Sequence, residues 1–357
     1  MREHNRCVAS VSDRPRGAVR RPAAFWLGVF AAACFAALLV HLGSGASDGS
    51  FFSFRLSPME VLRELARGDV GADSQNSIVW RIRLPRALAC VLAGGILGIV
   101  GSAFQALFRN PLAEPYIVGV SSGAAVGGAV AIALGIADLG AGIGMMGFAF
   151  VFGLGSLALV FGLASRRGVV DVQTLLLAGV VVGSMLAATL ALVLLAAGLD
   201  TNQVLRWLLG STTPMYWNRL AAMGSVLVVG GIVLALQTKR LNAFAVGEDT
   251  AQRLGVDTKT LKWTVLIAGT AMTAAAVGSV GIIGFLGLVA PHLARQLIGV
   301  DWRWSLIGSA LSGACLLLLA DVVAQRALPG GELPVGIVTA LLGAPALLFL
   351  LRRVPAA

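Results

Sequence analysis

The hydrophobic residues of this chain fall into long, nearly uninterrupted stretches that short polar segments separate. A helix needs about 20 mostly apolar residues to cross a bilayer. The stretches therefore predict ten spanning helices, at residues 23–42, 85–107, 118–137, 141–164, 174–197, 218–237, 262–280, 282–298, 304–323 and 333–351. The seventh and eighth run together and form a pair that is predicted to break near Gly281.

The composition agrees with this pattern. Apolar residues make up 57% of the 357 residues, charged residues only 12%, and the mean hydropathy is +0.87. Soluble domains carry about 25% charged residues, so this chain has too few to cover a surface that faces water. Its 45 glycines suit membrane helices, which pack through small residues. The predicted fold class is an all-α polytopic membrane protein.

The net charge of +10 predicts orientation and gives no support for a nucleic-acid partner. The charges lie at the ends of apolar segments and form no basic face with interleaved aromatic residues. With the N-terminus inside, 18 of the 27 Lys and Arg residues fall on the inner side, which predicts two cytoplasmic termini. Residues 1–22 are expected to form a disordered basic cytoplasmic tail, and residues 23–353 a single transmembrane domain. The first apolar stretch exceeds the usual length of a signal-peptide core, so a retained span is expected.

The loop at residues 43–84 is predicted to lie outside the membrane and to contain a short helix. Ser57 is followed by Pro58 and then by Glu60, which is the pattern of a capping box. The arginines at its end, Arg81, Arg83 and Arg86, break the positive-inside trend. They could snorkel to lipid headgroups or meet carboxylates of a partner, and composition does not decide between these.

The loop at residues 238–261 is the longest on the predicted inner side. Glu248 and Asp249 are expected to begin a short helix, Gly255 to end it in a left-handed conformation, and Asp257 to cap the next helix. Structured helices on a face with little other mass indicate a docking site for a soluble partner.

Small residues recur at a spacing of four, which places them on one helix face and lets backbones approach closely. The three sets are Gly94, Gly98 and Ser102; Gly119, Gly123 and Gly127; and Gly179, Gly183 and Ala187. Helix packing is the favoured interpretation over a ligand role.

Candidate catalytic chemistry is sparse. The chain has no phosphate-binding loop for ATP hydrolysis, and its four cysteines form no C-x-x-C pair. The three histidines are scattered, so no metal cluster and no cofactor are predicted. Ser121 with His292 faintly suggests an intramembrane serine protease, but a packing role for Ser121 is favoured.

Polar residues within apolar segments are candidates for function because burying them in lipid is costly. Gln105 could line a pathway or form an interhelical hydrogen bond, and both interpretations stay open. Asp321 is expected to be solvated near the outer boundary or to pair with Arg326. His292 is expected to be a structural histidine next to Pro291, which should kink its helix.

Several ordered motifs resemble the iron-chelate uptake permeases of the FecCD type, which include the permease of the cobalamin importer. The first group is Arg83-Leu84-Pro85-Arg86, Gly101 to Gln105, Arg109-Asn110-Pro111-Leu112-Ala113-Glu114-Pro115 and Gly119 to Ala124. The second group is Gly247-Glu248 through Leu254-Gly255, Ile283 to Val289, Pro291-His292 with Arg295, Leu319-Ala320-Asp321, Glu332 to Gly336 and Gly343-Ala344-Pro345.

The resemblance implies a non-enzymatic permease subunit of a type II ABC importer in the inner membrane. Such permeases form homodimers around an axial pathway, with two cytoplasmic ATP-binding subunits beneath and an extracytoplasmic binding protein above. Coupling to the ATPase would fall on residues 242–256, with Gly247, Glu248, Thr250, Arg253, Leu254 and Gly255. Pathway or structural motif positions would be Gln105, Asn110, Pro111, Gly119, Ser121, Gly123, Pro291 and His292.

By the same resemblance, Arg83 and Arg86 would face glutamates of the binding protein. The family's third docking arginine aligns with Gln325, and Arg326 lies one residue, or about 100° of helix rotation, further on. The family's gate would lie around residues 169–174. The expected substrate is a ferric siderophore, with cobalamin or haem as alternatives. An ion-coupled secondary transporter is the remote alternative, because it would need intramembrane acids that are nearly absent here.

Overall fold

A computed structural model describes residues 22–44, 56–69, 74–140, 142–166, 169–170, 172–196, 201–328 and 331–353. Nearly all of the predicted basic tail, part of the predicted outer loop and part of the predicted gate lie outside these residues. Within them the chain is helical, apart from turns, one isolated bridge and a short antiparallel pair of strands, β1 (Ser165–Arg166) and β2 (Val169–Val170).

The helices follow the predicted order along the chain. The first half contains α1 (Ala23–Gly43), α2 (Pro58–Arg67), α3 (Ser74–Ile78), the π-helix η1 (Val79–Arg83), α4 (Leu84–Leu107), the 3₁₀-helix η2 (Pro115–Val118), α5 (Val120–Ala133), α6 (Ile143–Ala164) and α7 (Val172–Ala196). The second half contains α8 (Thr201–Leu208), α9 (Trp217–Leu236), α10 (Thr238–Val246), α11 (Glu248–Arg253), α12 (Thr258–Val280), α13 (Leu286–Ile298), α14 (Trp302–Arg326) and α15 (Val335–Arg353).

Helices occupy all ten predicted positions, and in the described residues seven are long and apolar enough to cross a membrane. The other three predicted spans, at 118–137, 282–298 and 333–351, fall short of this length: α5 has 14 residues, α13 has 13, and the apolar part of α15 that the structure describes is Val335–Leu348. α5 is shortened by the turn η2 before it and by the turn at Gly135 after it. Gly281, at φ +76°, ends α12, which confirms the predicted break.

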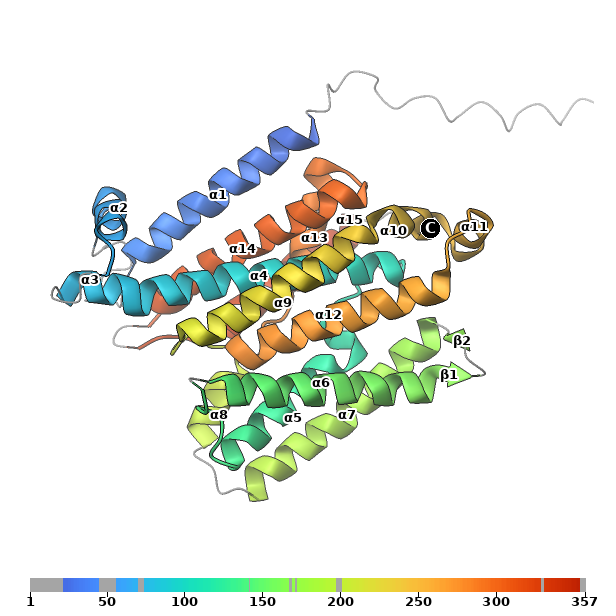
Figure 1. Cartoon of the computed structure of the whole chain (residues 1–357), viewed down its shortest axis with the longest axis horizontal. Helices are drawn as coiled ribbons and strands as arrows, with labels where there is room; N and C mark the ends of the chain where they lie inside the picture. The colour runs from blue at the N-terminus through green and yellow to red at the C-terminus, as the bar shows by residue number, and fades with distance from the viewer. Residues whose placement is uncertain are drawn as a thin grey trace, which may run out of the picture.

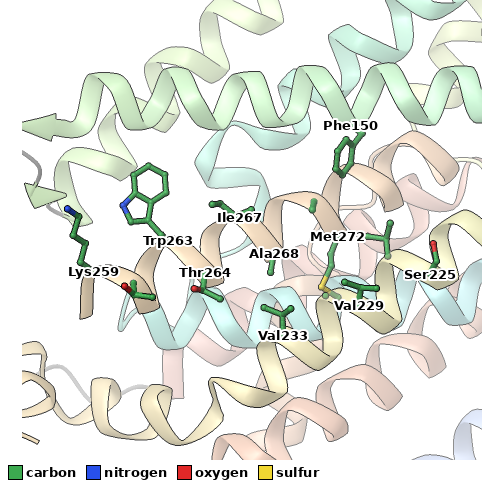
Figure 2. A pocket seen from close by; sticks show the side chains of 14 residues that line it. Phe150, Ser225, Val229, Val233, Lys259, Trp263, Thr264, Ile267, Ala268 and Met272 are labelled. Carbon is green, nitrogen blue, oxygen red and sulfur yellow. The ribbon is translucent and has the colours of Figure 1, made fainter. Parts of the chain in front are cut away.

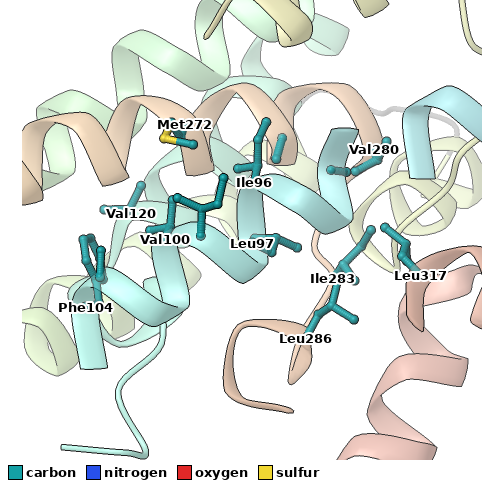
Figure 3. Close-up of a cluster of buried hydrophobic side chains, with 14 of the residues drawn as sticks. Ile96, Leu97, Val100, Phe104, Val120, Met272, Val280, Ile283, Leu286 and Leu317 are labelled. Atoms are coloured by element: carbon teal, nitrogen blue, oxygen red, sulfur yellow. The ribbon is translucent and has the colours of Figure 1, made fainter. Parts of the chain in front are cut away.

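The helices run side by side along the long axis, with α1 at one edge and α7 at the other (Figure 1). α4 lies in the interior, and 20 of its 24 residues are buried. Its Ile96, Leu97, Val100 and Phe104 pack in one cluster with apolar side chains of α12, α14 and the α12–α13 link (Figure 3). A helix that is apolar on all sides is expected at the centre of such a bundle.

Backbone-to-backbone contacts occur at Gly94 and Gly98 of α4 and at Gly123 and Gly127 of α5, which confirms the prediction that these glycines serve packing. A Cβ atom at Gly94 or Gly98 would overlap carbonyl groups of α14, at Gly313 and Ser309 respectively. At Gly123 a Cβ atom would lie 2.6 Å from the Phe152 carbonyl oxygen of α6. Close approach of this kind brings many atoms into van der Waals contact, which drives helix association in lipid.

The predicted capping box begins α2. The Ser57 hydroxyl accepts the Glu60 backbone N–H at 3.3 Å, and the Glu60 carboxylate accepts the Ser57 backbone N–H at 2.7 Å. Hydrogen bonds from the Ser57 backbone N–H and the Ser57 side chain hold the pKa of the Glu60 carboxyl below its ordinary value. α2 and the first turn of α4 lie at one end of the bundle, and α10 and α11 lie at the other (Figure 1). We call these the α2 end and the α11 end.

Candidate functional site

The loop between α9 and α12 folds as two short helices, as its sequence predicts. α11 begins at Glu248, and Gly255 follows it with φ +80°. The Asp257 carboxylate accepts the Thr260 backbone N–H at 3.1 Å and the Thr260 hydroxyl at 2.6 Å, so it caps α12. These hydrogen bonds hold the pKa of Asp257 below its ordinary value. The loop is therefore a structured element with its ends tied to two long helices.

Three contacts fasten this loop to the bundle. The Phe244 side chain of α10 is fully buried, and Lys262 of α12 pairs with Glu248 at 2.6 Å. The Asn242 amide donates to the Asp301 carboxylate at 2.9 Å and its oxygen accepts the Trp302 N–H at 3.0 Å. Sequence reasoning did not foresee the Asn242 contacts, because the partners lie about 60 residues apart. The α10–α11 loop is consequently tied to α12 and to the start of α14.

The same loop has apolar side chains that are exposed at its surface. Val246 is 76% exposed and Leu254 is 69% exposed, one on each side of α11. Arg253 and Thr250 are exposed as well, and Gly247 has φ +154°, which an L side chain would strain. Exposed apolar residues on a fastened, structured loop are typical of a protein interface.

At the α2 end, side chains from four segments surround one buried carboxylate. Asp321 of α14 is 1% exposed, and Arg86 of α4 binds it twice, at 2.7 and 3.1 Å. His41 of α1 lies 2.7 Å away, and the Thr212 hydroxyl donates at 2.8 Å. The Gln325 amide adds a fifth contact at 2.9 Å. We call these residues the Asp321 cluster.

The Asp321 cluster corrects one prediction. Asp321 is buried and pairs with Arg86, not with Arg326, because the packing of α4 against α14 brings Arg86 to it. Ligand atoms of His41, Cys90 and Asp321 lie within 4.8 Å of one another. Both Asp321 oxygens already accept hydrogen bonds, so the carboxylate is occupied by protein donors as it stands.

The three arginines predicted for docking differ in exposure. Arg83 is half-buried and donates to the Leu42 carbonyl at 2.8 Å. Arg86 is 6% exposed and also pairs with Glu332 at 2.8 Å, and Arg326 is 5% exposed. Gln325 belongs to the Asp321 cluster, whereas Arg326 projects from another side of α14. Arg83 is the least buried of the three, and the docking role of all three stays a prediction.

Gln105 joins α4 to α13. Its amide donates to the Gly287 carbonyl at 3.2 Å, and its oxygen accepts a hydrogen bond from Arg295. The Gly287 carbonyl is free because Pro291, four residues on, has no N–H to donate to it. Of the two interpretations left open by the sequence, the structure shows the interhelical hydrogen bond. Gln105 therefore contacts Gly287, a residue of the Ile283 to Val289 motif, through the carbonyl that Pro291 leaves without a donor.

The loop after α4 is ordered by its own motif. Asn110 accepts the Leu112 N–H on its side chain at 2.9 Å, and Pro111 is exposed. Burial raises the pKa of the Glu114 carboxyl to about 7, and a hydrogen bond from the Phe285 backbone N–H offsets part of that rise. The Tyr116 hydroxyl donates to the Ile283 carbonyl and accepts its N–H, at 2.7 and 2.8 Å, so it clamps the α12–α13 link.

The structure gives no support to the serine protease alternative. His292 is partly exposed and lies 2.7 Å from the Gln296 amide, while the Ser121 hydroxyl is buried with no hydrogen-bond partner among the described residues. Gly119, at φ +77°, caps α5, and its carbonyl accepts the Ser156 hydroxyl at 2.8 Å. Gly119, Ser121 and Gly123 thus lie in the packed start of α5.

A bundle of apolar helices, seven of them in the described residues long enough to cross a membrane, is the architecture of a multi-pass membrane protein. The model of the FecCD transport family matches residues 35–353. The chain belongs to this family.

Bacterial and archaeal relatives match most of this chain in sequence. The chain is 41% identical to the cobalamin import permease BtuC of Halobacterium salinarum, over 78% of this chain and 74% of that one. It is 39% identical to the hemin transport permease HmuU of Yersinia pestis, over 78% and 86%. It is also 39% identical to the ABC transporter permease YvrB of Bacillus subtilis, over 80% and 82%. The chain is therefore an ABC importer permease of the type II class.

A solved structure supports the assignment. A metal-chelate type ABC transporter in an inward-facing conformation superposes with a TM-score of 0.78 at 28% identity, covering 93% of this chain and all of that one. PsaBC from Streptococcus pneumoniae, at 17% identity and a TM-score of 0.56, shares the fold over 77% of this chain and 92% of that one.

Proposed function

We propose that this permease forms a homodimer that imports a metal chelate, powered by two cytoplasmic ATP-binding subunits and loaded by an extracytoplasmic binding protein. The observation that carries the proposal is the α10–α11 loop, which exposes Val246 and Leu254 while fastened to α12 and α14. ATP-driven closure of the partner subunits would move this loop. Its contacts would then tilt the spans and open the axial pathway alternately to each side.

A ferric siderophore is the first substrate to test, and cobalamin and haem are the alternatives that the relatives' names support. The permease would be reconstituted in vesicles with its ATPase and binding protein, and uptake of each labelled chelate measured with and without ATP. We expect ATP-dependent uptake of one chelate class. Uptake without the ATPase would instead indicate an ion-coupled transporter. The pairing of Asp321 with Arg86 argues against that alternative, because an ion-coupling acid must be free to bind its ion.

The first prediction concerns the α10–α11 loop. Leu254→Glu places a charge at the proposed ATPase interface, where desolvation would be costly, so coupled ATP hydrolysis and transport should fall at least tenfold. The measurement is binding-protein-stimulated ATPase activity of the reconstituted complex. Leu139→Glu is the matched control, because Leu139 is also 69% exposed but lies in the α5–α6 loop at the α2 end. Equal losses in both variants would refute the assignment.

The second prediction concerns docking at the α2 end. Arg83→Glu should weaken binding-protein affinity about tenfold, or ~1.4 kcal/mol, because an ion pair becomes a repulsion. Surface plasmon resonance on the reconstituted permease measures this, and co-purification of the ATPase should not change. Arg81→Glu is the control, since it reverses the same charge on the same π-helix at a residue to which the family resemblance gives no docking role. Unchanged affinity in Arg83→Glu would contradict the docking role.

A further inference from the structure

An apolar groove of about 750 Å³ runs along the outside of the bundle between α6, α9 and α12. Figure 2 shows α12 as its floor, with Phe150 of α6 on one side and Val229 and Val233 of α9 on the other. Lys259 and Ser225 lie at opposite ends. Neither the sequence motifs nor the proposed transport cycle gives this groove a role.

Two contacts hold the three helices in this arrangement. Trp263 of α12 stacks on Phe161 of α6, with ring centroids 4.3 Å apart. Gly230 of α9 accommodates the Met272 side chain, whose sulfur would lie 2.5 Å from a Cβ atom at that position. α6 and α9 are each fastened to α12 in this way, and the groove lies between them.

The groove has the length of one acyl chain in one leaflet. From Lys259 to Met272 the α12 axis rises about 20 Å, at 1.5 Å per residue. Half of a bilayer's hydrocarbon core is about 15 Å thick. The groove therefore reaches from the headgroup level at the α11 end to about the middle of the membrane.

Polarity changes along the groove as it does along a phospholipid. Ile267, Ala268 and Met272 line the interior, whereas Lys259 and Trp263 lie toward the α11 end, where interfacial aromatic and basic residues are expected. Lys259 is exposed, and within the described ranges its ammonium forms no ion pair, whereas Lys262 pairs with Glu248. The nearby Asp257 carboxylate is engaged in capping α12. Lys259 is thus available to a negatively charged headgroup.

We infer that this groove is a binding site for one anionic phospholipid of the leaflet at the α11 end, with an acyl chain along α12 and its phosphate on Lys259. The leaflet is the cytoplasmic one on the topology proposed above. α9 leads into α10, and α12 follows α11, so the bound lipid contacts the two spans that flank the proposed coupling loop. A lipid whose affinity changes with the spacing of these spans would modulate transport.

The test uses the full chain in phosphatidylcholine vesicles that contain phosphatidylglycerol with a photoreactive acyl chain. Wild type should crosslink to peptides of α9 and α12, and Lys259→Gln should reduce this labelling about fivefold, as expected for one lost cation near a headgroup. Ala268→Phe fills the groove and should abolish labelling. Photoreactive phosphatidylcholine should label these peptides weakly in all variants.

Two matched controls make the result decisive. Lys239→Gln removes an exposed charge at the same end without touching the groove, and Val228→Phe enlarges an exposed side chain of α9 that does not line it. Both should label like wild type, and size-exclusion profiles verify folding. Equal labelling by the two lipids, or unchanged labelling in Ala268→Phe, would overturn the site. No readout depends on ATP or substrate, so the result is independent of the transport proposal.

Discussion

Replacing Asp321 by asparagine is expected to destabilise the permease more than any other single polar substitution at the α2 end. The substitution removes the negative charge that Arg86 binds twice. It also places an amide donor where the carboxylate now accepts hydrogen bonds or contacts other donors, from Arg86, His41, Thr212 and Gln325. Leaving one member of a buried ion pair without its partner costs about 3–5 kcal/mol. We expect a large drop in the thermal midpoint and low recovery from membranes.

The measurement is the fraction of monodisperse protein after a temperature series, read by size-exclusion chromatography. Glu332→Gln is the control, since Glu332 is 38% exposed and contacts the same Arg86, and a pair of that exposure contributes about 0–1 kcal/mol. The double variant Arg86→Met with Asp321→Leu should recover part of the loss, because no charge is then stranded. A midpoint of Asp321→Asn equal to wild type would show that the cluster adds nothing to stability.

Gly98→Ala, the smallest possible enlargement, is expected to disrupt the core of the bundle. The added methyl would overlap the Ser309 carbonyl oxygen of α14, which belongs to a helical backbone and cannot rotate away. α4 and α14 would have to separate, and Gly94 would lose its close contact with Gly313. Overpacking a core by a single methyl lowers the free energy of unfolding by about 1–3 kcal/mol. Because the clashing atom here belongs to the backbone, we expect a loss at or above the upper value.

The chain supplies a control three residues away. A Cβ atom at Gly95 would have its nearest neighbour, the Ala310 carbonyl oxygen, at 3.8 Å, which is an ordinary contact. Gly95→Ala should therefore match wild type or exceed it slightly, because alanine restricts the unfolded chain more than glycine does. Chemical unfolding in detergent would compare the variants. Similar midpoints for Gly98→Ala and Gly95→Ala would contradict this account of the α4–α14 contact.

Features that depend on neighbouring residues could be predicted from the sequence. The capping box at Ser57, the start of α11 at Glu248, the cap at Asp257 and the break at Gly281 each rest on side-chain chemistry within a few positions. The apolar stretches located the helices for the same reason. The family motifs added the class of transporter, which composition alone could not distinguish from other membrane bundles.

Features that depend on packing could not be predicted in this way. Asp321 was expected to be solvated or to pair with Arg326, but its partners Arg86 and His41 lie 235 and 280 residues away in the chain. Only the juxtaposition of α1, α4 and α14 brings them together. The one available signal was an acid inside an apolar stretch, which indicates that a partner must exist without identifying it.

Gln105 ties α4 to α13 through side-chain hydrogen bonds that leave both helical ladders intact. Inside an ordinary helix each carbonyl is held by the helix's own N–H four residues on. Pro291 leaves the Gly287 carbonyl of α13 without that donor, so the Gln105 amide binds it at 3.2 Å while the Gln105 oxygen accepts a hydrogen bond from Arg295 of the same helix. A neutral bond of this kind contributes about 1 kcal/mol net. A relative shift of α4 and α13 would therefore exchange side-chain bonds of Gln105 and would require no backbone hydrogen bond of either helix to break.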